Sequence, residues 1–280
     1  MKIHELIAAG PTRSFEFFPP KTDEGRSQLE ATLDELEAIT PSFVSVTYGA
    51  GGTTRDLTRD LVVGINATHP YPAMPHLTCM GHTSAQIQDM LRDYAKSGIT
   101  NILALAGDPP ADGSPVSGDF HYASDLIEVA RSVGQFSVGV AAFPEGHPRS
   151  ASLTEDRRNL AAKLEGADFG ITQFFFDADH YSRMVDDLAA LGCETPVLPG
   201  IMPMLNPATI RRFAEMNRAS FPEELADRVE RAVGDDRMAI AVDSAVQLCE
   251  TLQTRGAPGL HLYCLNRSEG ARRILEAVQH

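Results

Sequence analysis

Short runs of apolar, β-branched and aromatic residues recur along the chain, and each is followed by a turn signal and then by a helical pattern. Parallel strands that are buried on both faces have this continuous apolar character. The runs cover residues 14–18, 43–48, 74–79, 101–107, 136–143, 169–176, 196–202 and 259–266. The pattern therefore predicts eight strands that alternate with helices.

The segments between these runs have the signals of amphipathic helices. The segment that begins after Thr83 and Ser84 has good N-cap residues, and it stops at Gly98, a favourable C-cap. The long interval 203–258 leaves room for additional helix before the last strand. Strand–helix alternation without a linker predicts a single (β/α)₈ barrel domain over residues 1–280.

An open doubly wound sheet is the alternative fold, but no GxGxxG sequence follows the first strand.

The composition limits the kinds of molecule that the protein can bind. A net charge of −14 argues against a nucleic acid, and no apolar run approaches the roughly 20 residues of a membrane span. The N-terminal apolar patch is too short for a signal peptide.

The four cysteines have neither CxxC spacing nor histidines at metal-ligand spacing, which predicts buried free thiols and no metal site. We therefore expect a cytoplasmic protein that acts on a small molecule. The sequence leaves its oligomeric state open.

Barrel enzymes place their active sites at the carboxyl ends of the strands. The polar residues at the predicted strand ends are Glu16, Thr47, Tyr48, His76, Thr78, Asp108, Glu145, His147, Gln173, Asn266 and Arg267. Several have an ordinary structural explanation, because threonine is common in strands and Asp108 precedes two prolines, as turn residues do. The segment GAGGTT at 49–54 is most simply a turn in which Thr53 or Thr54 caps the next helix.

Glu16 and Gln173 are harder to explain as packing. Strand alternation places each on one face with the residues two positions away, namely Ser14 and Phe18 for Glu16, and Ile171 and Phe175 for Gln173. Both side chains should be enclosed in a barrel. A carboxyl group withdrawn from water holds its proton to higher pH and can act as a general acid, and an enclosed amide can fix a flat heterocycle.

A series of collinear motifs covers nearly the whole chain. They are SFEFFPPK (14–21), FVSVTYGAGG (43–52), PHLTC (75–79), GDPP (107–110), YASDL (122–126), FPEGHP (143–148), ITQFFFD (171–177), PGIMP (199–203) and LYCLNR (262–267). With these motifs the chain resembles the methylenetetrahydrofolate reductase family. The resemblance implies a (β/α)₈ barrel that reduces 5,10-methylenetetrahydrofolate to 5-methyltetrahydrofolate with NADH or NADPH, usually through bound FAD. The chain is similar to the short bacterial form, without the regulatory extension of eukaryotic members.

The resemblance also implies roles for single residues. Glu16 matches the general acid, Asp108 the acidic residue beside the reacting centre, and Gln173 the glutamine that binds the pterin. Phe213 matches an aromatic that stacks on the substrate or the nicotinamide, and Arg267 an arginine near the glutamate tail of the folate. The positions that match the lining of the flavin or nicotinamide site are Thr47, His76, Tyr122, His147, Asp156, Asn159 and Lys163.

The implied chemistry needs these residue types. Protonation of N10 opens the substrate ring to an electrophilic N5 iminium cation, and Glu16 would supply that proton. Asp108 would favour the developing positive charge, and Gln173 would fix the pterin ring. A reduced cofactor held over the pterin face would then deliver hydride.

The sequence departs from the family at three positions of the flavin pocket. Ala106 replaces an arginine, Phe143 replaces a tyrosine, and Ala162 stands where at least some members have a basic residue. These losses predict a protein without tightly bound FAD, in which NADH transfers hydride directly to the folate. The nicotinamide would then use Thr47, Tyr48 and the GAGG turn.

Other functions are also compatible with the residues. An FAD-mediated ping-pong reductase of the same reaction is one alternative, and a metal-dependent hydrolase that uses His76, His147 and Asp108 is another. A third is a catalytically silent folate-binding protein, which would bind reduced folate without consuming NADH.

Overall fold

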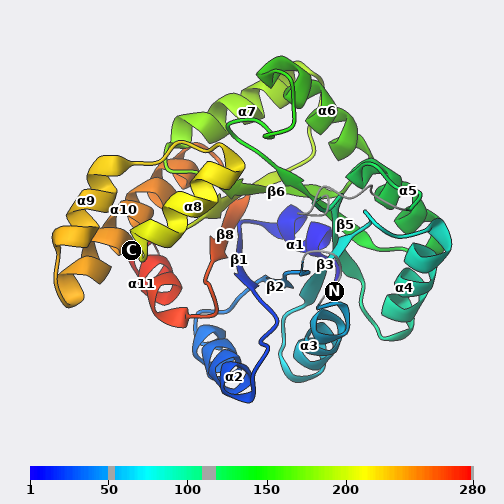
Figure 1. Ribbon diagram of the computed structural model, residues 1–280, viewed down its shortest axis with the longest axis horizontal. Helices are drawn as coiled ribbons and strands as arrows, with labels where there is room; N and C mark the ends of the chain where they lie inside the picture. Colours follow the sequence, from blue (N-terminus) through cyan, green and yellow to red (C-terminus); the bar gives the residue numbers. More distant parts are fainter. Residues whose placement is uncertain (50–53, 109–117, 279–280) are drawn as a thin grey trace.

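The computed structural model describes residues 1–49, 54–108 and 118–278. Eight parallel strands close into a barrel in which each strand pairs with the next and β8 pairs with β1 (Figure 1). The strands are β1 (Thr12–Phe17), β2 (Phe43–Val46), β3 (Ala73–Thr78), β4 (Asn101–Leu105), β5 (Ser137–Ala142), β6 (Phe169–Phe174), β7 (Val197–Ile201) and β8 (Gly259–Tyr263). The predicted (β/α)₈ barrel is confirmed, and the open sheet is excluded.

The helices are α1 (Ile3–Ala9), α2 (Asp23–Glu37), α3 (Arg55–Thr68), α4 (Ser84–Lys96), α5 (Ala123–Val133), α6 (Leu153–Gly166), α7 (Ala178–Ala190), α8 (Pro207–Asn217), α9 (Glu223–Arg231), α10 (Asp235–Thr254) and α11 (Ser268–Val278). Most of them lie around the outside of the barrel, whereas α1 lies across one of its ends (Figure 1). The additional helix predicted between β7 and β8 is present as α8, α9 and α10. Within the described residues, none of the helices is long and apolar enough to cross a membrane.

Helix α4 begins and ends at the capping residues that the sequence predicts. Thr83 is the N-cap, and its hydroxyl accepts a hydrogen bond from the main-chain N–H of Gln86. Gly98 follows the C-cap with φ of +77°, a conformation that glycine adopts without steric cost. Thr54 is the N-cap of α3, but its hydroxyl accepts from the N–H of Gly49 and makes no cap bond to the helix. Thr53 and the GAGG residues 50–52 lie outside the described residues.

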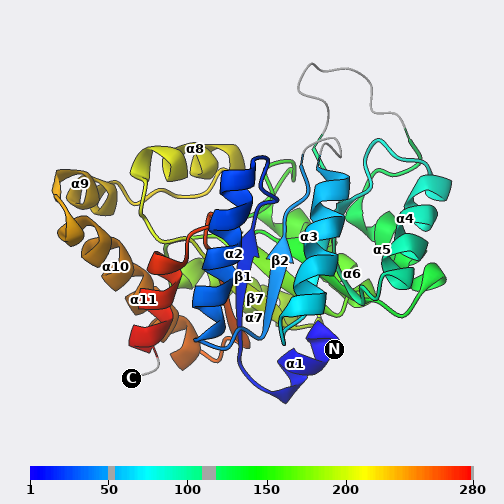
Figure 2. The same cartoon turned by 90° about the horizontal axis from the view of Figure 1, so that it is seen from below.

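The short helix α1 was not predicted, and it lies at the end of the barrel opposite α8 (Figure 2). Ile3 and Ile7 of α1 pack on apolar side chains that fill the lower barrel. These are Phe43, Met74, Leu103, Phe169, Ile171 and Leu198. The N–H of Ile3 also donates to Oδ1 of Asn101 at 2.8 Å. The helix therefore plugs the amino end of the barrel and leaves the carboxyl end for the site.

A bulge corrects the predicted alternation along β6. The register between β6 and β7 shifts between Ile171 and Phe174, so facing cannot be extrapolated across this point. Ile171 lies inside the barrel, whereas Phe175 lies in the main hydrophobic cluster and stacks on Tyr181. Gln173 therefore sits at a main-chain irregularity, which the sequence did not reveal.

Asn266 links the end of β8 to the segment that follows β1. Its Nδ2 donates to the carbonyl oxygen of Phe18 at 2.9 Å, and its Oδ1 accepts from the N–H of Phe18 at 2.8 Å. The φ of Asn266 is +58°, in the left-handed region that asparagine tolerates better than most residues.

We expect Asn266→Ala to lower the free energy of unfolding by about 1–2 kcal/mol, because both hydrogen bonds are lost and alanine strains the backbone. Asn266→Gly is the matched control, since it removes the bonds and relieves the strain. The free energy of unfolding measured in urea should be highest for the wild type, lower for the Gly variant and lowest for the Ala variant. An Ala variant as stable as the wild type would disprove this role.

Candidate active site

Glu16 lies inside the barrel between histidines from two other strands. Its Oε2 is 3.4 Å from Nε2 of His76 on β3 and 3.6 Å from Nε2 of His261 on β8. The Glu16 side chain is 14% exposed, so the predicted enclosure of this carboxyl group is confirmed. Burial lowers the pKa of His76, against the opposing effect of Glu16, so His76 is largely neutral near pH 7. The Glu16 carboxyl group therefore lies between two buried imidazole rings.

His261 is a site residue that the sequence analysis missed. It is fully buried, and its ring stacks on Phe43 with the planes 20° apart. Ser14 Oγ lies 2.8 Å from Nδ1 of His261 and donates to the carbonyl oxygen of Leu260 at 3.2 Å. The signal was present in the sequence HLY, because alternation along β8 puts His261 and Tyr263 on one face.

Gln173 is half-buried on β6, and two neighbours hold it. Its Oε1 accepts from Nδ2 of Asn217, the last residue of α8, at 3.5 Å. The phenol of Tyr263 donates to the carbonyl oxygen of Thr172, directly before Gln173, at 2.7 Å. Neither Asn217 nor Tyr263 was predicted as a site residue, because both contacts join segments far apart in the sequence.

The remaining residues predicted near the substrate lie at different depths. Phe213 of α8 is half-buried and packs against an apolar cluster above the barrel that includes Phe174. Arg267 is exposed immediately after Asn266. Thr47 is half-buried at the end of β2, where its N–H donates to the carbonyl oxygen of Phe17.

The placement of Tyr48 corrects its predicted contact with a nicotinamide. Tyr48 is only 9% exposed and belongs to the main hydrophobic cluster, together with Val44 and Val46 of β2. Burial raises the pKa of its phenol. The structure therefore puts Tyr48 in the layer between strands and helices and does not bring it to Glu16.

Asp156 and His147, both predicted to line the cofactor site, contact each other. Oδ1 of Asp156 accepts from the N–H of His147 at 2.9 Å and from the hydroxyl of Ser150 at 3.1 Å. The His147 ring lies edge-on to Phe143, with ring centres 4.5 Å apart. Burial lowers the pKa of His147, and the neighbouring cations Arg149 and Lys163 lower it further. Oδ1 of Asp156 therefore stabilises the segment 147–150, which precedes α6.

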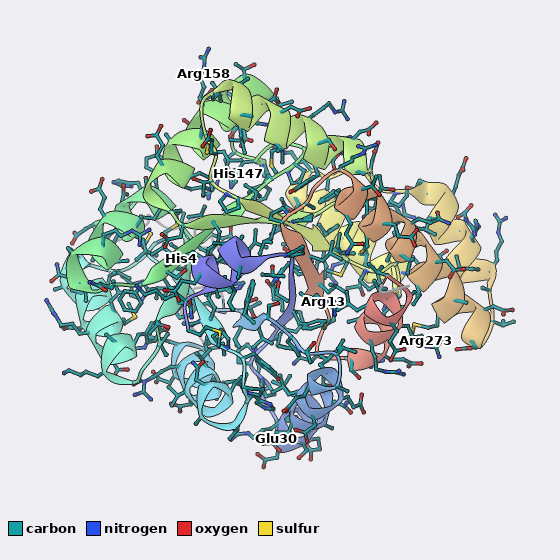
Figure 3. The ribbon with its side chains drawn as sticks, turned by 180° about the vertical axis from the view of Figure 1, so that it is seen from behind. His4, Arg13, Glu30, His147, Arg158 and Arg273 are labelled. Carbon is teal, nitrogen blue, oxygen red and sulfur yellow. The ribbon has the colours of Figure 1, made fainter. Side chains whose placement is uncertain are left out.

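The basic side chains Lys163 and Arg157 also form hydrogen bonds within the protein. Lys163 donates to the carbonyl oxygen of Ala141 at 2.6 Å. Arg157, whose side chain is 4% exposed, donates to the carbonyl oxygens of Phe143 and Pro144 and pairs with Asp156 at 2.8 Å. The next basic residue of α6, Arg158, projects outward from the rim (Figure 3).

Tyr122 and Asn159, which are predicted to line the cofactor site, are exposed. Asp108, which is predicted to lie beside the reacting centre, is also exposed. At the positions that depart from the family, Ala162 on α6 is exposed and Ala106 after β4 is half-buried. A pyrophosphate is held best by charge-assisted bonds from cations. Arg157 and Lys163 already bond to main-chain carbonyl oxygens.

Lys163 gives the folded protein a defined pH dependence. Burial lowers its pKa from 10.5 to about 8. Between these values the unfolded chain holds a proton that the folded protein has released, so the stability contributed by this group rises with pH. Urea unfolding should therefore show that the free energy of unfolding of the wild type, relative to that of Lys163→Met, increases from about pH 8 to about pH 10. A difference that does not change with pH would contradict this.

A metal-dependent hydrolase receives no support from the geometry. Among residues 1–49, 54–108 and 118–278, one group of potential metal ligands has its ligand atoms within 4.8 Å of one another: Asp34, Glu37 and His69. His76, His147 and Asp108 do not form such a group. The first two members lie on α2 and the third directly after α3, so the group is not at the barrel site.

A closed (β/α)₈ barrel that encloses a carboxyl group between two histidines has the architecture of a barrel enzyme. The chain matches the family model described as methylenetetrahydrofolate reductase over residues 2–279. It therefore belongs to the methylenetetrahydrofolate reductase family, a family of oxidoreductases.

Individual relatives agree with this assignment. The chain is 39% identical over 261 residues to 5,10-methylenetetrahydrofolate reductase of Escherichia coli K12, with 91% of this chain and 86% of that protein covered. It is 35% identical over 293 residues to a probable methylenetetrahydrofolate reductase (NADH) of Oryza sativa, covering 98% of this chain and 49% of the rice protein.

A solved structure supports the fold alone. An uncharacterized protein from Clostridium thermocellum, which binds two copies of 5-methyl-5,6,7,8-tetrahydrofolic acid, aligns with a TM-score of 0.66 at 14% identity. The alignment covers 99% of this chain and 97% of that one.

Proposed function

We propose that this protein reduces 5,10-methylenetetrahydrofolate to 5-methyltetrahydrofolate, taking hydride directly from NADH, or from NADPH, without bound flavin. The observation that carries the proposal is Glu16, a mostly buried carboxyl group between two imidazoles at the centre of a family barrel. A mostly buried carboxyl group is costly to fold around, and proton donation is a function that accounts for it.

Glu16 donates its proton to N10 of the substrate, which breaks the bond between N10 and the methylene carbon and leaves an N5 iminium cation. The carboxylate that remains lies 3.4 Å from Nε2 of His76 and 3.6 Å from Nε2 of His261. A hydride from the nicotinamide then adds to the iminium carbon and completes the methyl group.

The other side chains orient the reactants. Gln173 fixes the pterin with its amide, and Asp108 favours the cation from the rim. Phe213 stacks on the ligand, and Arg267, which is exposed beyond β8, is available for the carboxylates of the glutamate tail. Each of these roles follows from the family resemblance and is compatible with the observed placement.

Direct transfer is supported by the state of the predicted flavin pocket. Arg157 and Lys163 are bonded to main-chain carbonyls, and Ala106, Phe143 and Ala162 replace larger or polar family residues. A nicotinamide that binds and leaves in each turnover needs less affinity than a resident cofactor, and its hydride can reduce an iminium carbon unaided. The name of the rice relative, which specifies NADH, favours that donor.

Protein purified without added FAD should lack a flavin absorbance band and still oxidise NADH when methylenetetrahydrofolate is present. Initial rates with both substrates varied should give intersecting lines, because direct transfer needs a ternary complex, whereas a ping-pong scheme gives parallel lines. Parallel lines together with stoichiometric flavin would return the enzyme to the FAD-mediated scheme. Folate binding without NADH oxidation would favour the silent binding protein.

We also place the enzyme in the cytoplasm. Its four cysteines are free, and disulfides are typical of oxidising compartments.

A further inference from the structure

We propose that Tyr263 is a positioning residue that aims Gln173 at the pterin by anchoring the bulge of β6. This role rests on the proposed function, because it presupposes that Gln173 orients the substrate. Tyr263 is the last residue of β8, and its phenol donates to the carbonyl oxygen of Thr172 on β6 at 2.7 Å. The side chain thus spans β7, the strand between them in the barrel order.

Gly200 on β7 provides the space for this crossing. A Cβ atom at Gly200 would lie 2.7 Å from the Tyr263 ring and 2.3 Å from the carbonyl oxygen of Thr172. Both distances are shorter than van der Waals contact, so a side chain at this position would displace the ring or the carbonyl. The N–H of Gly200 also donates to the Thr172 hydroxyl at 2.8 Å, which fixes Thr172 from its other side.

The carbonyl of Thr172 lies where the β6–β7 ladder is irregular, between Ile171 and Phe174. A bulge leaves main-chain groups outside the regular ladder, and a buried carbonyl needs a donor from elsewhere. The Tyr263 phenol is that donor. Because Gln173 directly follows Thr172, the same bond fixes the main chain that carries the amide.

One further contact holds Gln173, and another joins Tyr263 to His261. Asn217 holds the side-chain oxygen from α8, so the amide is constrained at both its main chain and its tip. The Tyr263 ring stands edge-on to His261, with centres 5.5 Å apart. Burial and the nearby Glu16 raise the pKa of Tyr263 well above its usual value, so the phenol remains a donor under assay conditions. Tyr263 therefore connects the acid cluster to the amide without being a second acid.

The test compares Tyr263→Phe with the matched control Tyr181→Phe. Tyr181 is buried, whereas Tyr263 is half-buried, and it also donates its phenol to a main-chain carbonyl, that of Val197 at 2.7 Å, but from α7 on the outside of the barrel. We expect Tyr263→Phe to lower kcat/KM for methylenetetrahydrofolate by about tenfold with an unchanged KM for NADH, because small misplacement is costly in catalysis. Tyr181→Phe should change kcat/KM by less than about twofold.

A double-mutant cycle with Gln173→Ala separates positioning from general stability. If Tyr263 acts through Gln173, Tyr263→Phe should lower kcat/KM by less than about twofold when Gln173 is already alanine. An undiminished tenfold loss in that background, or equal losses in the two Tyr→Phe variants, would overturn the proposal. Urea midpoints of each variant show whether it remains folded. A wild type that fails to oxidise NADH with this folate would instead overturn the proposed function.

Discussion

Replacing Glu16 by glutamine should lower the turnover number by about 10² to 10⁴, the usual contribution of a general acid. The amide keeps the shape of the side chain but does not protonate N10, so the ring stays closed and the methylene carbon remains a poor hydride acceptor. The dissociation constant of 5-methyltetrahydrofolate, measured by fluorescence titration, should change by less than about tenfold, because the product needs no further proton from this residue.

Glu145→Gln is the matched control for this variant. The Glu145 side chain is also 14% exposed, and it follows β5 near the same end of the barrel. Its carboxylate accepts from the N–H of Ser220 at 2.9 Å and lies 3.1 Å from Nδ1 of His180, so it links the segment after β5 to α7 and to the segment between α8 and α9. A Glu16→Gln enzyme with near-normal turnover, or an equal loss in Glu145→Gln, would refute the assignment of the acid.

The second large effect is expected for Gln173→Ala. Removing the amide leaves its polar partners on the pterin unpaired, which costs roughly 1–3 kcal/mol, or about 5- to 150-fold in kcat/KM for the folate. The KM for NADH should be nearly unchanged, since the amide acts on the pterin. Asn217→Ala, which removes only the contact to the tip of Gln173, should have a smaller effect in the same direction. Unaltered folate kinetics in Gln173→Ala would contradict the predicted role.

The barrel could be predicted because its information is local. Each buried strand is a short apolar run, and each helix has end signals such as Thr83 and Gly98, so element type and order follow from neighbouring residues. Strand ends were less accurate. The apolar run predicts a strand over 101–107, but β4 ends at Leu105, because residues near the carboxyl end leave the ladder for the loops of the site. Helix α1 is seven residues long and buries only Ile3 and Ile7, which is too short a segment for a clear periodicity.

The site was only partly predictable, for a physical reason. Glu16 and Gln173 stood out because a polar group in an apolar run demands an explanation. His261 and Tyr263 act through contacts across the barrel, and their partners depend on strand register, which a single sequence does not reveal. Tyr48 matches a family motif, but it lies two residues beyond β2 and is buried in the main hydrophobic cluster with Val44 and Val46.

The central claim is direct hydride transfer from the nicotinamide to the folate. The most direct measurement uses NADH carrying deuterium at both C4 positions, with protein purified without FAD and methylenetetrahydrofolate as acceptor. Mass spectrometry of the product should find one deuterium in the methyl group of 5-methyltetrahydrofolate, because a hydride passed from carbon to carbon does not exchange with water. Deuterium lost to the solvent, or product formed only after FAD is added, would contradict direct transfer.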